Sequence, residues 1–291
     1  MKTKIWLMMM VIGCFALSMS AERFTIETGQ FEKIKVTTNI NVVYHCVSDS
    51  TGFAWYDAEA GMDDVFFLSV KKDGGLKIQV TDAYWGKTLP VLHVYSDFLS
   101  SVENSSDLSL TLINPAPCAS FSANQIGNGS ITAENLKCNN VSAAITTGNG
   151  SVNLSGKCVN ANFQMVGAGL ISADRLQAEN VKCTILGTGS IGCWPVDNLT
   201  VKGLGTTKIY YKGSPNIKKT GGGKLFELPE DDDDDYYETG AIPVKVDSFN
   251  ERFSADDEDD DELDDEEDDE EDDDEEEEID EETQTIVTAD E

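Results

Sequence analysis

Apolar and polar residues alternate along most of the stretch from Gly127 to Tyr211. Apolar side chains recur at every second position, and Asn, Thr, Ser and Lys stand between them. A period of two predicts strands with one buried face. The residues expected to face inward are Leu136, Cys138, Val141, Ala143, Ile145, Val152, Leu154, Cys158, Phe163, Met165, Ile171, Ala173, Leu176, Ala178, Val181, Cys183, Ile185, Ile191, Cys193, Leu199, Val201, Ile209 and Tyr211.

A short glycine phrase interrupts this alternation at a nearly constant interval. Gly-x-Gly copies begin at Gly127, Gly148, Gly167 and Gly187, and a looser copy begins at Gly203. A period near 20 residues is typical of solenoids, whose units bury their apolar faces only by stacking on one another. Each unit has room for two or three strands, broken at corners where glycine allows a positive φ. We therefore predict a parallel β-solenoid of roughly five to seven coils in residues 116–224.

The chain before these repeats also predicts strands, but it is more aromatic and less regular. Its β-branched or aromatic runs are 24–26, 34–36, 40–44, 65–70, 76–80, 91–95 and 108–112. The turn sequence Lys72-Asp-Gly-Gly75 between two of them predicts a local antiparallel hairpin. We expect residues 21–115 to form an irregular all-β part that caps the solenoid and continues into it, since an open end would pair with other chains.

The order of these phrases resembles the putative auto-transporter adhesin "head GIN" domain family, which is common in Bacteroidetes. The opening residues 31–36, 42–44 and 75–78 are similar to that family's beginning, and residues 201–217 are similar to its ending. The resemblance extends from about Phe24 to Thr220. It implies an exported β-helical protein whose biochemical role is not established, and it supplies no catalytic residues.

The first twenty residues have the composition of an export signal. Lys2 and Lys4 precede an apolar run from Ile5 to Leu17, and the small residues around Ser20 suit cleavage. The run is too short to span a bilayer. An alternative is lipidation at Cys14, which would attach the protein to a membrane. We expect a signal peptide over 1–20 and a location in the periplasm, at the outer membrane or cell surface, or outside the cell.

The composition changes abruptly near residue 225. Of the 54 acidic residues in the chain, 36 lie from Glu230 onward, and only two of the 21 basic residues do. Such a charge density with few apolar residues prevents collapse, so we expect a disordered acidic tail over 225–291. A short apolar island from Thr239 to Phe253 could add a strand or act as a linear motif. The tail could also bind divalent cations weakly or act as a charge shield.

Three of the seven cysteines, Cys118, Cys138 and Cys158, are one repeat apart. They are expected to stack in adjacent coils, about 4.8 Å apart at Cα. A buried thiol ladder is favoured, because stacked strands give a poor approach for a relaxed disulfide. A disulfide between two rungs remains an alternative, because an oxidising compartment favours it. A metal site is less favoured, because the chain has no Cys-x-x-Cys pair and only two histidines.

Candidate catalytic and cofactor motifs are weak. Gly187–Gly192 matches Gly-x-Gly-x-x-Gly, but no helix is expected after it, so nucleotide binding is not expected. Glu134 and Asp174 occupy similar offsets in non-adjacent coils, about 9.6 Å apart by strand spacing. That separation is marginal for a polysaccharide-hydrolysing pair. We name no catalytic, cofactor-binding or metal-binding residue.

The favoured function is therefore an exported, non-enzymatic binding protein, with a surface glycan or a protein as its partner. We expect no cofactor and no nucleic-acid partner. A polysaccharide-active β-helix enzyme is the first alternative, and a charge-shield or weak calcium-binding envelope protein is the second.

Overall fold

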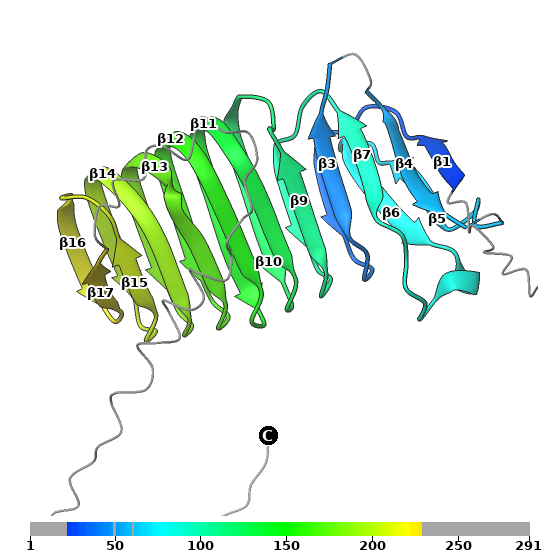
Figure 1. Cartoon of the computed structure of the whole chain (residues 1–291). Helices are drawn as coiled ribbons and strands as arrows, with labels where there is room; N and C mark the ends of the chain where they lie inside the picture. Colours follow the sequence, from blue (N-terminus) through cyan, green and yellow to red (C-terminus); the bar gives the residue numbers. More distant parts are fainter. Residues whose placement is uncertain (1–21, 49–50, 60, 229–291) are drawn as a thin grey trace, which may run out of the picture. The chain divides into compact units, whose positions relative to one another are not determined.

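Strands dominate residues 22–48, 51–59 and 61–228, which are the part of the chain that the computed structural model describes (Figure 1). They belong to one 17-stranded sheet, and a single 3-10 turn, η1 (Asp82–Tyr84), interrupts them. The strands are β1 (Glu22–Glu27), β2 (Lys33–Val36), β3 (Val42–Cys46), β4 (Phe53–Ala58), β5 (Phe66–Val70), β6 (Gly75–Val80), β7 (Leu92–Ser96), β8 (Ser101–Asn104), β9 (Ser109–Ile113), β10 (Cys118–Ile126), β11 (Ser130–Thr147), β12 (Ser151–Met165), β13 (Leu170–Ile185), β14 (Ser190–Gly203), β15 (Lys208–Tyr211), β16 (Asn216–Gly221) and β17 (Lys224–Glu227). The all-β fold class is confirmed.

The long strands β10 to β14 are coils of a parallel solenoid. Each pairs in parallel with the next, and β11 meets β12 in three segments, beginning at Ser130, Leu136 and Asn140. The register shifts between Ala133 and Leu136, at one of the corners where the chain turns. The predicted short strands are therefore present as segments of longer, bent strands. The solenoid has about six turns, as the repeat period indicated.

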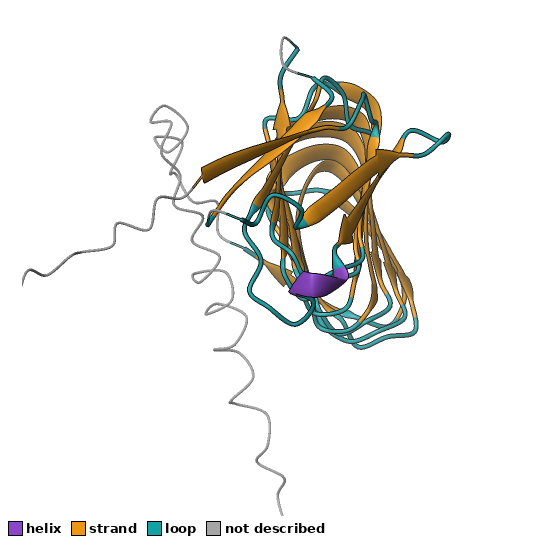
Figure 2. Ribbon diagram, turned by 90° about the vertical axis from the view of Figure 1, so that its right-hand side faces the viewer, coloured by secondary structure: helices purple, strands orange, loops and turns teal. Residues whose placement is uncertain are grey.

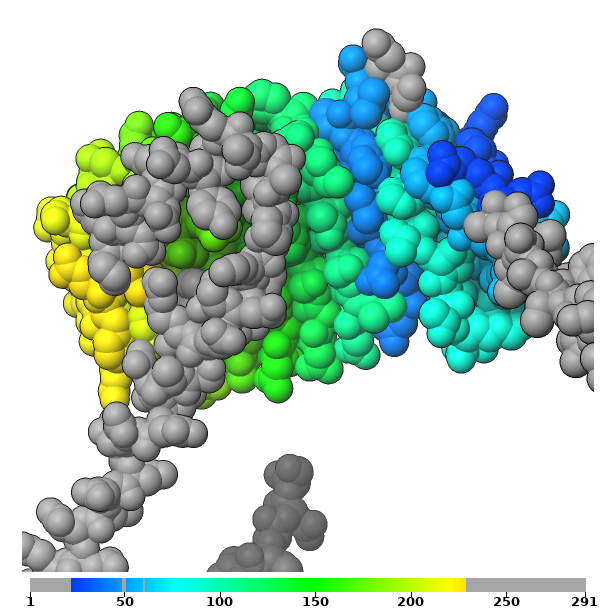
Figure 3. Space-filling model, viewed as in Figure 1, coloured from blue at the N-terminus to red at the C-terminus, as the bar shows by residue number. Residues whose placement is uncertain are grey.

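The core runs through the centre of the coils. Every residue predicted to face inward is buried except Tyr211, which is half-buried next to the last coil. Alternation of Val, Ile, Ala and Cys at these positions fills the interior because successive coils place equivalent side chains one strand spacing apart. The surface of the first strands, blue and cyan in Figure 3, continues into that of the green repeat coils.

The Gly-x-Gly corners lie above one another, as predicted. The reason why glycine is needed differs between the corners. Gly127 and Gly148 have a positive φ of 95° and 80°. Gly167 and Gly187 do not, so the expected backbone requirement is wrong for them. Crowding explains these two instead: a Cβ atom on Gly167 would lie 2.6 Å from the carbonyl oxygen of Gly148, and one on Gly187 would overlap the carbonyl oxygen of Gly167.

The first coil in the sequence is not the first coil in space. Strand β2 pairs in parallel with both β6 and β8, and β3 pairs with both β7 and β9. The β2–β3 coil is thus sandwiched between two coils that come later in the chain. Beyond β7, antiparallel pairing takes over: β4 pairs with β7, and β1 pairs with β4. These strands close the end of the stack that faces the viewer in Figure 2.

The predicted hairpin is present as β5 and β6, which pair antiparallel across a turn closed by a bond from the Gly74 amide to the Lys71 carbonyl. Two strands, β4 and β8, had not been predicted. At the other end, β17 continues to Glu227, three residues beyond the expected end of the repeats. The predicted signal peptide, Cys14 and the acidic tail from residue 229 lie outside the described residues.

Candidate functional site

The most distinctive surface of the described residues lies on the outer face of β1, β4, β7 and β3. Strand alternation turns Tyr44, Ala54, Tyr56 and Val94 into the core and their neighbours outward. We call the outward set the aromatic surface; it consists of Arg23, His45, Phe53, Trp55, Asp57, His93 and Tyr95. These side chains are half-buried or exposed.

Strand register places the rings of the aromatic surface in two stacked rows. In one row Tyr95 stacks on Phe53, with centroids 4.5 Å apart and 8° between the planes, and on His45 at 4.6 Å and 12°. In the other row Trp55 stacks on His93 at 4.0 Å and 6°. Such separations follow from the strand spacing, and aromatic pairs of this kind contribute about 0.5–1.5 kcal/mol beyond the area they bury.

Hydrogen bonds join the two rows. The Trp55 indole Nε1 donates to the Tyr95 hydroxyl at 3.0 Å. His45 Nε2 lies 3.0 Å from His93 Nδ1, so one nitrogen donates and the other accepts. That bond requires at least one neutral imidazole. Burial is the main cause that lowers the pKa of both histidines, and the mutual charge of the pair lowers the pKa of His45 further.

An ion pair lies at the edge of the aromatic surface. Arg23 Nε and Nη2 donate to the two carboxylate oxygens of Asp57 at 2.9 and 3.0 Å. The guanidinium carbon is 3.8 Å from the centroid of the Trp55 ring, a cation–π contact. The hydrogen bonds from Arg23 lower the pKa of Asp57, so this carboxylate is ionised at neutral pH. The surface therefore combines fixed rings, a bidentate ion pair and hydrogen-bonding edges.

This arrangement suits the binding of a partner. Tyr, Trp and Arg are the residue types that dominate binding energy at protein interfaces, and rigid aromatic side chains lose little entropy on binding. This site was not predicted from the sequence, because no strand was expected at β4. The signal was present in the alternation of Phe53, Trp55 and Asp57 with Ala54 and Tyr56.

The carboxylates considered for hydrolysis lie on different coils. Glu134 is on β11 and Asp174 is on β13, with β12 between them. Asp174 accepts a hydrogen bond from the Ser172 hydroxyl at 3.1 Å. Gly187–Gly192, the look-alike of a nucleotide motif, forms a corner and the beginning of β14, and it leads into a strand rather than a helix.

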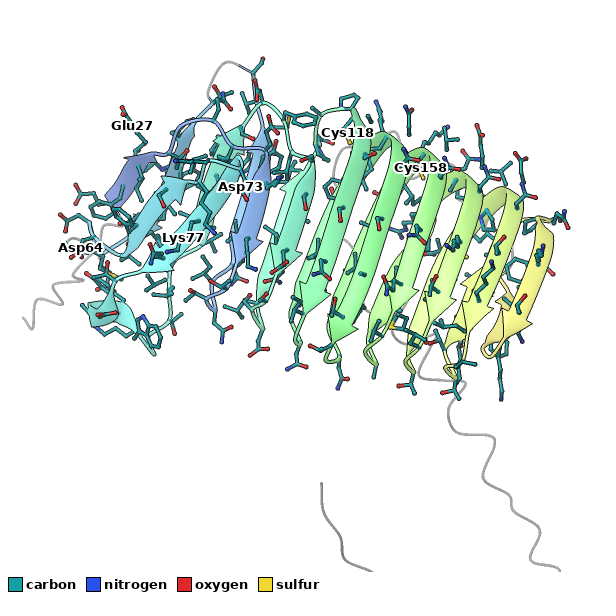
Figure 4. All side chains as sticks on the ribbon, turned by 180° about the vertical axis from the view of Figure 1, so that it is seen from behind. Glu27, Asp64, Asp73, Lys77, Cys118 and Cys158 are labelled. Atoms are coloured by element: carbon teal, nitrogen blue, oxygen red, sulfur yellow. The ribbon has the colours of Figure 1, made fainter. Side chains whose placement is uncertain are left out.

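The predicted cysteine column is present. Cys118 pairs with Cys138, and Cys138 pairs with Cys158, on successive coils. Figure 4 shows Cys118 and Cys158 along one edge of the stack. All three are free thiols. Cys138 and Cys158 are buried as expected, whereas Cys118, on the first coil of the column, is only half-buried. A second pair, Cys183 and Cys193, lies fully inside the core, where a hydrogen bond between the thiols and burial raise the pKa of Cys193.

Within residues 22–48, 51–59 and 61–228, no three His, Cys, Asp or Glu side chains lie close enough together to hold a metal ion. Nor does this part of the chain contain a helix with the length and apolarity that crossing a membrane requires.

The sequence model of the family described as "Putative auto-transporter adhesin, head GIN domain" matches residues 30–215. The chain belongs to this family. The match includes the strands β2 to β15 and therefore most of the aromatic surface. It confirms the family resemblance seen in the sequence. None of the curated proteins matches the chain.

Solved structures of Bacteroidetes proteins are similar in fold to this head GIN chain. A putative adhesin from Bacteroides fragilis is 21% identical with a TM-score of 0.62, over 72% of this chain and 98% of that one. A putative lipid binding protein from Parabacteroides distasonis is 19% identical with a TM-score of 0.55, over 72% and 97%. A putative adhesin from Parabacteroides merdae is 19% identical with a TM-score of 0.53, over 72% and 96%. At these identities the likeness concerns the fold.

Proposed function

We propose that this head GIN protein is an exported, non-enzymatic binding protein of the cell envelope or cell surface, and that it contacts its partner through the aromatic surface. The partner is a surface glycan or a protein. The observation that carries the proposal is the outward stack of Trp55, Tyr95 and Phe53, edged by Arg23 and Asp57.

The argument for binding begins with the position of these rings. A protein gains little by placing so many aromatic side chains on an outer face unless a partner covers them, because exposed aromatic area favours association. The stack is rigid, since neighbouring strands fix each ring. The family, described as putative adhesins, supports a surface-binding role. Export is supported by the composition of the first twenty residues.

Binding assays with the purified full chain test the aromatic surface. The probes are the uncharged glycans of a glycan array and a panel of immobilised glycoproteins. We expect Trp55→Ala to weaken the strongest interaction found by roughly tenfold to thirtyfold, the effect of truncating an interface tryptophan. Trp85→Ala is the matched control, because Trp85 is 72% exposed and lies outside the aromatic surface. Thermal unfolding of both variants checks that each is folded.

Two results would overturn this proposal: binding unchanged by Trp55→Ala, or binding weakened equally by Trp85→Ala. Placement is tested separately, by fractionating cells and treating intact cells with protease. Digestion on intact cells places the protein at the surface, and protection until the outer membrane is opened places it in the periplasm. Recovery in the cytoplasm would contradict export. A Cys14→Ala variant distinguishes lipidation from soluble cleavage, because only lipidation would tie membrane association to that residue.

A further inference from the structure

A second surface, separate from the aromatic surface, runs along the outside of the repeat coils. It is a shallow, open groove made of two adjoining hollows of about 290 and 580 Å³ that share Asn160 and Asn162. The groove extends from Ser100, before β8, to Lys218 on β16. It therefore follows the axis along which the coils stack, rather than the direction of any one strand.

One wall of the groove is a ladder of asparagines. Asn140, Asn160, Asn180, Asn198 and Asn216 occupy successive rungs. The side-chain amide of Asn160 donates to Asn140 at 3.1 Å, that of Asn180 to Asn160 at 3.3 Å, and that of Asn198 to Asn180 at 2.8 Å. Each amide has two N–H groups and an oxygen with two lone pairs, so the ladder keeps donors and acceptors available for a ligand.

The other wall is polar at every rung. Its residues, in register across the coils, are Ser122, Ser142, Asn162, Lys182, Thr200 and Lys218. Lys202 lies in the neighbouring row, between Thr184 and Thr220. The side chains of Lys182, Lys202 and Lys218 are exposed, and none of them forms an ion pair within the described residues.

The charge of the groove is positive toward the end of the solenoid. Three lysines and no carboxylate line the larger hollow. Glu179 and Asp197 come directly before the ladder residues Asn180 and Asn198, but they lie outside the groove. In residues 175–224 as a whole, eight basic residues face two acidic ones. This segment of the solenoid thus carries a local excess of positive charge, although the whole chain has a net charge of −33.

We propose that this groove binds an extended anionic polysaccharide, with its chain along the solenoid axis. The ammonium groups of Lys182, Lys202 and Lys218 pair with the carboxylate or sulfate groups of the polysaccharide. The asparagine ladder exchanges hydrogen bonds with its hydroxyl groups. The rungs repeat about every 4.8 Å, so the ladder offers hydrogen-bonding groups at short, regular intervals along the axis of the bound chain. The site goes beyond the proposed function, because it shares no residue with the aromatic surface.

Polysaccharide fits the groove better than other polyanions. The lining residues include no exposed aromatic side chain, whereas single-stranded nucleic acids are held by stacking their bases on aromatic rings. An acidic peptide offers carboxylates but few hydroxyl groups for the ladder. A surface built from amides, hydroxyls and ammonium groups matches a ligand that is rich in hydroxyls and carries spaced negative charges.

Binding of the full chain to polygalacturonate, which is carboxylated, and to heparin, which is sulfated, tests the proposal. Neutral dextran is the reference ligand. We expect the triple variant Lys182→Ala/Lys202→Ala/Lys218→Ala to bind roughly tenfold more weakly, since exposed charge pairs contribute about 0.2–1 kcal/mol each. The matched control is Lys71→Ala/Lys72→Ala/Lys77→Ala, which removes three lysines from the β5–β6 hairpin.

A variant that gains affinity complements the loss. Glu179→Gln/Asp197→Asn removes the two carboxylates beside the ladder without touching the groove lining, and we expect it to bind about twofold to fourfold more tightly. Affinity should fall as salt rises, because the lysines are exposed. Trp55→Ala should bind these polymers like the native chain, so failure at the groove is distinguishable from failure at the aromatic surface.

Three outcomes would overturn the groove site. The first is native affinity in the triple lysine variant, and the second is an equal loss in the hairpin control. The third is equal affinity for polyglutamate or single-stranded DNA at the same salt concentration, which would show attraction of any polyanion without use of the asparagine ladder.

Discussion

His45 on β3 and His93 on β7 make the stability of the amino-terminal strands sensitive to pH. Both histidines have a lowered pKa in the folded protein, chiefly because burial disfavours the charged imidazolium. In the unfolded chain they take up protons at their ordinary pKa of about 6.5. The unfolded state therefore binds more protons between that pH and the lower folded pKa. The contribution of the two histidines to stability is fully present above pH 6.5. We expect the free energy of unfolding to fall as the pH drops below that value.

Chemical unfolding of the native chain and of His45→Phe/His93→Phe at several pH values between 5 and 7.5 measures this effect. Phenylalanine keeps a ring in each stack but does not titrate. We expect the double variant to lose most of the change in stability across this range. An identical pH dependence in the two proteins would show that the histidine pair does not cause it.

The cysteine column is expected to be chemically inert in the folded protein. Burial raises the pKa of Cys118 and of Cys158 to about 12, so at pH 8 both remain protonated, and the thiolate is the reactive form. We expect a thiol reagent to label Cys118, Cys138 and Cys158 only slowly in native protein and rapidly after unfolding. Mass spectrometry of labelled peptides measures the rates.

Cys46 serves as an internal comparison in the labelling experiment, because it is half-buried and stands outside the column. Rapid native labelling of all three column residues would contradict a buried ladder. Labelling of the unfolded chain that requires prior reduction would show a disulfide between two rungs instead.

At the scale of the structural elements, the Gly-x-Gly corners are the most sensitive to added side-chain volume. Gly167→Val would place a side chain against the Gly148 carbonyl oxygen, 2.6 Å from its Cβ, and against the Ile145 side chain. We expect the variant to lower the free energy of unfolding by about 1–3 kcal/mol, the usual cost of overpacking. Denaturant unfolding of the purified chain measures the loss.

The neighbouring residue gives a matched control for the corner. Ala168 is exposed at the same turn, so Ala168→Val adds similar volume toward solvent and should change stability by less than about 0.5 kcal/mol. Equal stability of the two variants would mean that the close stacking of the glycine corners does not limit which residues fit there.

The strands of the glycine repeats were predictable from sequence, and two strands of the irregular amino-terminal part, β4 and β8, were not. The inward positions of β11 to β14 follow directly from alternation, because equivalent residues of successive coils stack. Strand β4 was missed even though Phe53, Trp55 and Asp57 alternate with smaller or buried residues. The aromatic surface was missed with it, since Tyr95 and His93 become neighbours of Trp55 only through the pairing of β4 with β7. Local patterns contain no information on such distant pairing.

At the scale of the whole molecule, the acidic run from Asp256 to Glu282 should bind calcium weakly. Tuned calcium sites need six to eight oxygens arranged by a loop, and a continuous run of Asp and Glu offers charge without that geometry. We expect roughly millimolar, salt-sensitive binding in the full chain and none of it after truncation at Leu228. Isothermal titration calorimetry measures both.

The same truncation distinguishes a cation role from a charge shield. A soluble, folded core that has lost calcium uptake supports the cation role, and a core that aggregates with or without calcium supports the shield. Micromolar affinity with induced structure would contradict both.

The position of the β2–β3 coil has a consequence for the order in which this protein can fold as it is synthesised. Strands β2 and β3 need partners on both sides, and the last of these, β9, ends only at Ile113. The earliest coil to leave the ribosome must therefore wait for more than sixty further residues before its hydrogen bonds are complete. The repeat coils β11 to β14 need only their immediate neighbours, so nucleation there costs less loop-closure entropy. Assembly would then proceed from the middle of the chain back toward its beginning, and the amino-terminal strands would stay extended until late.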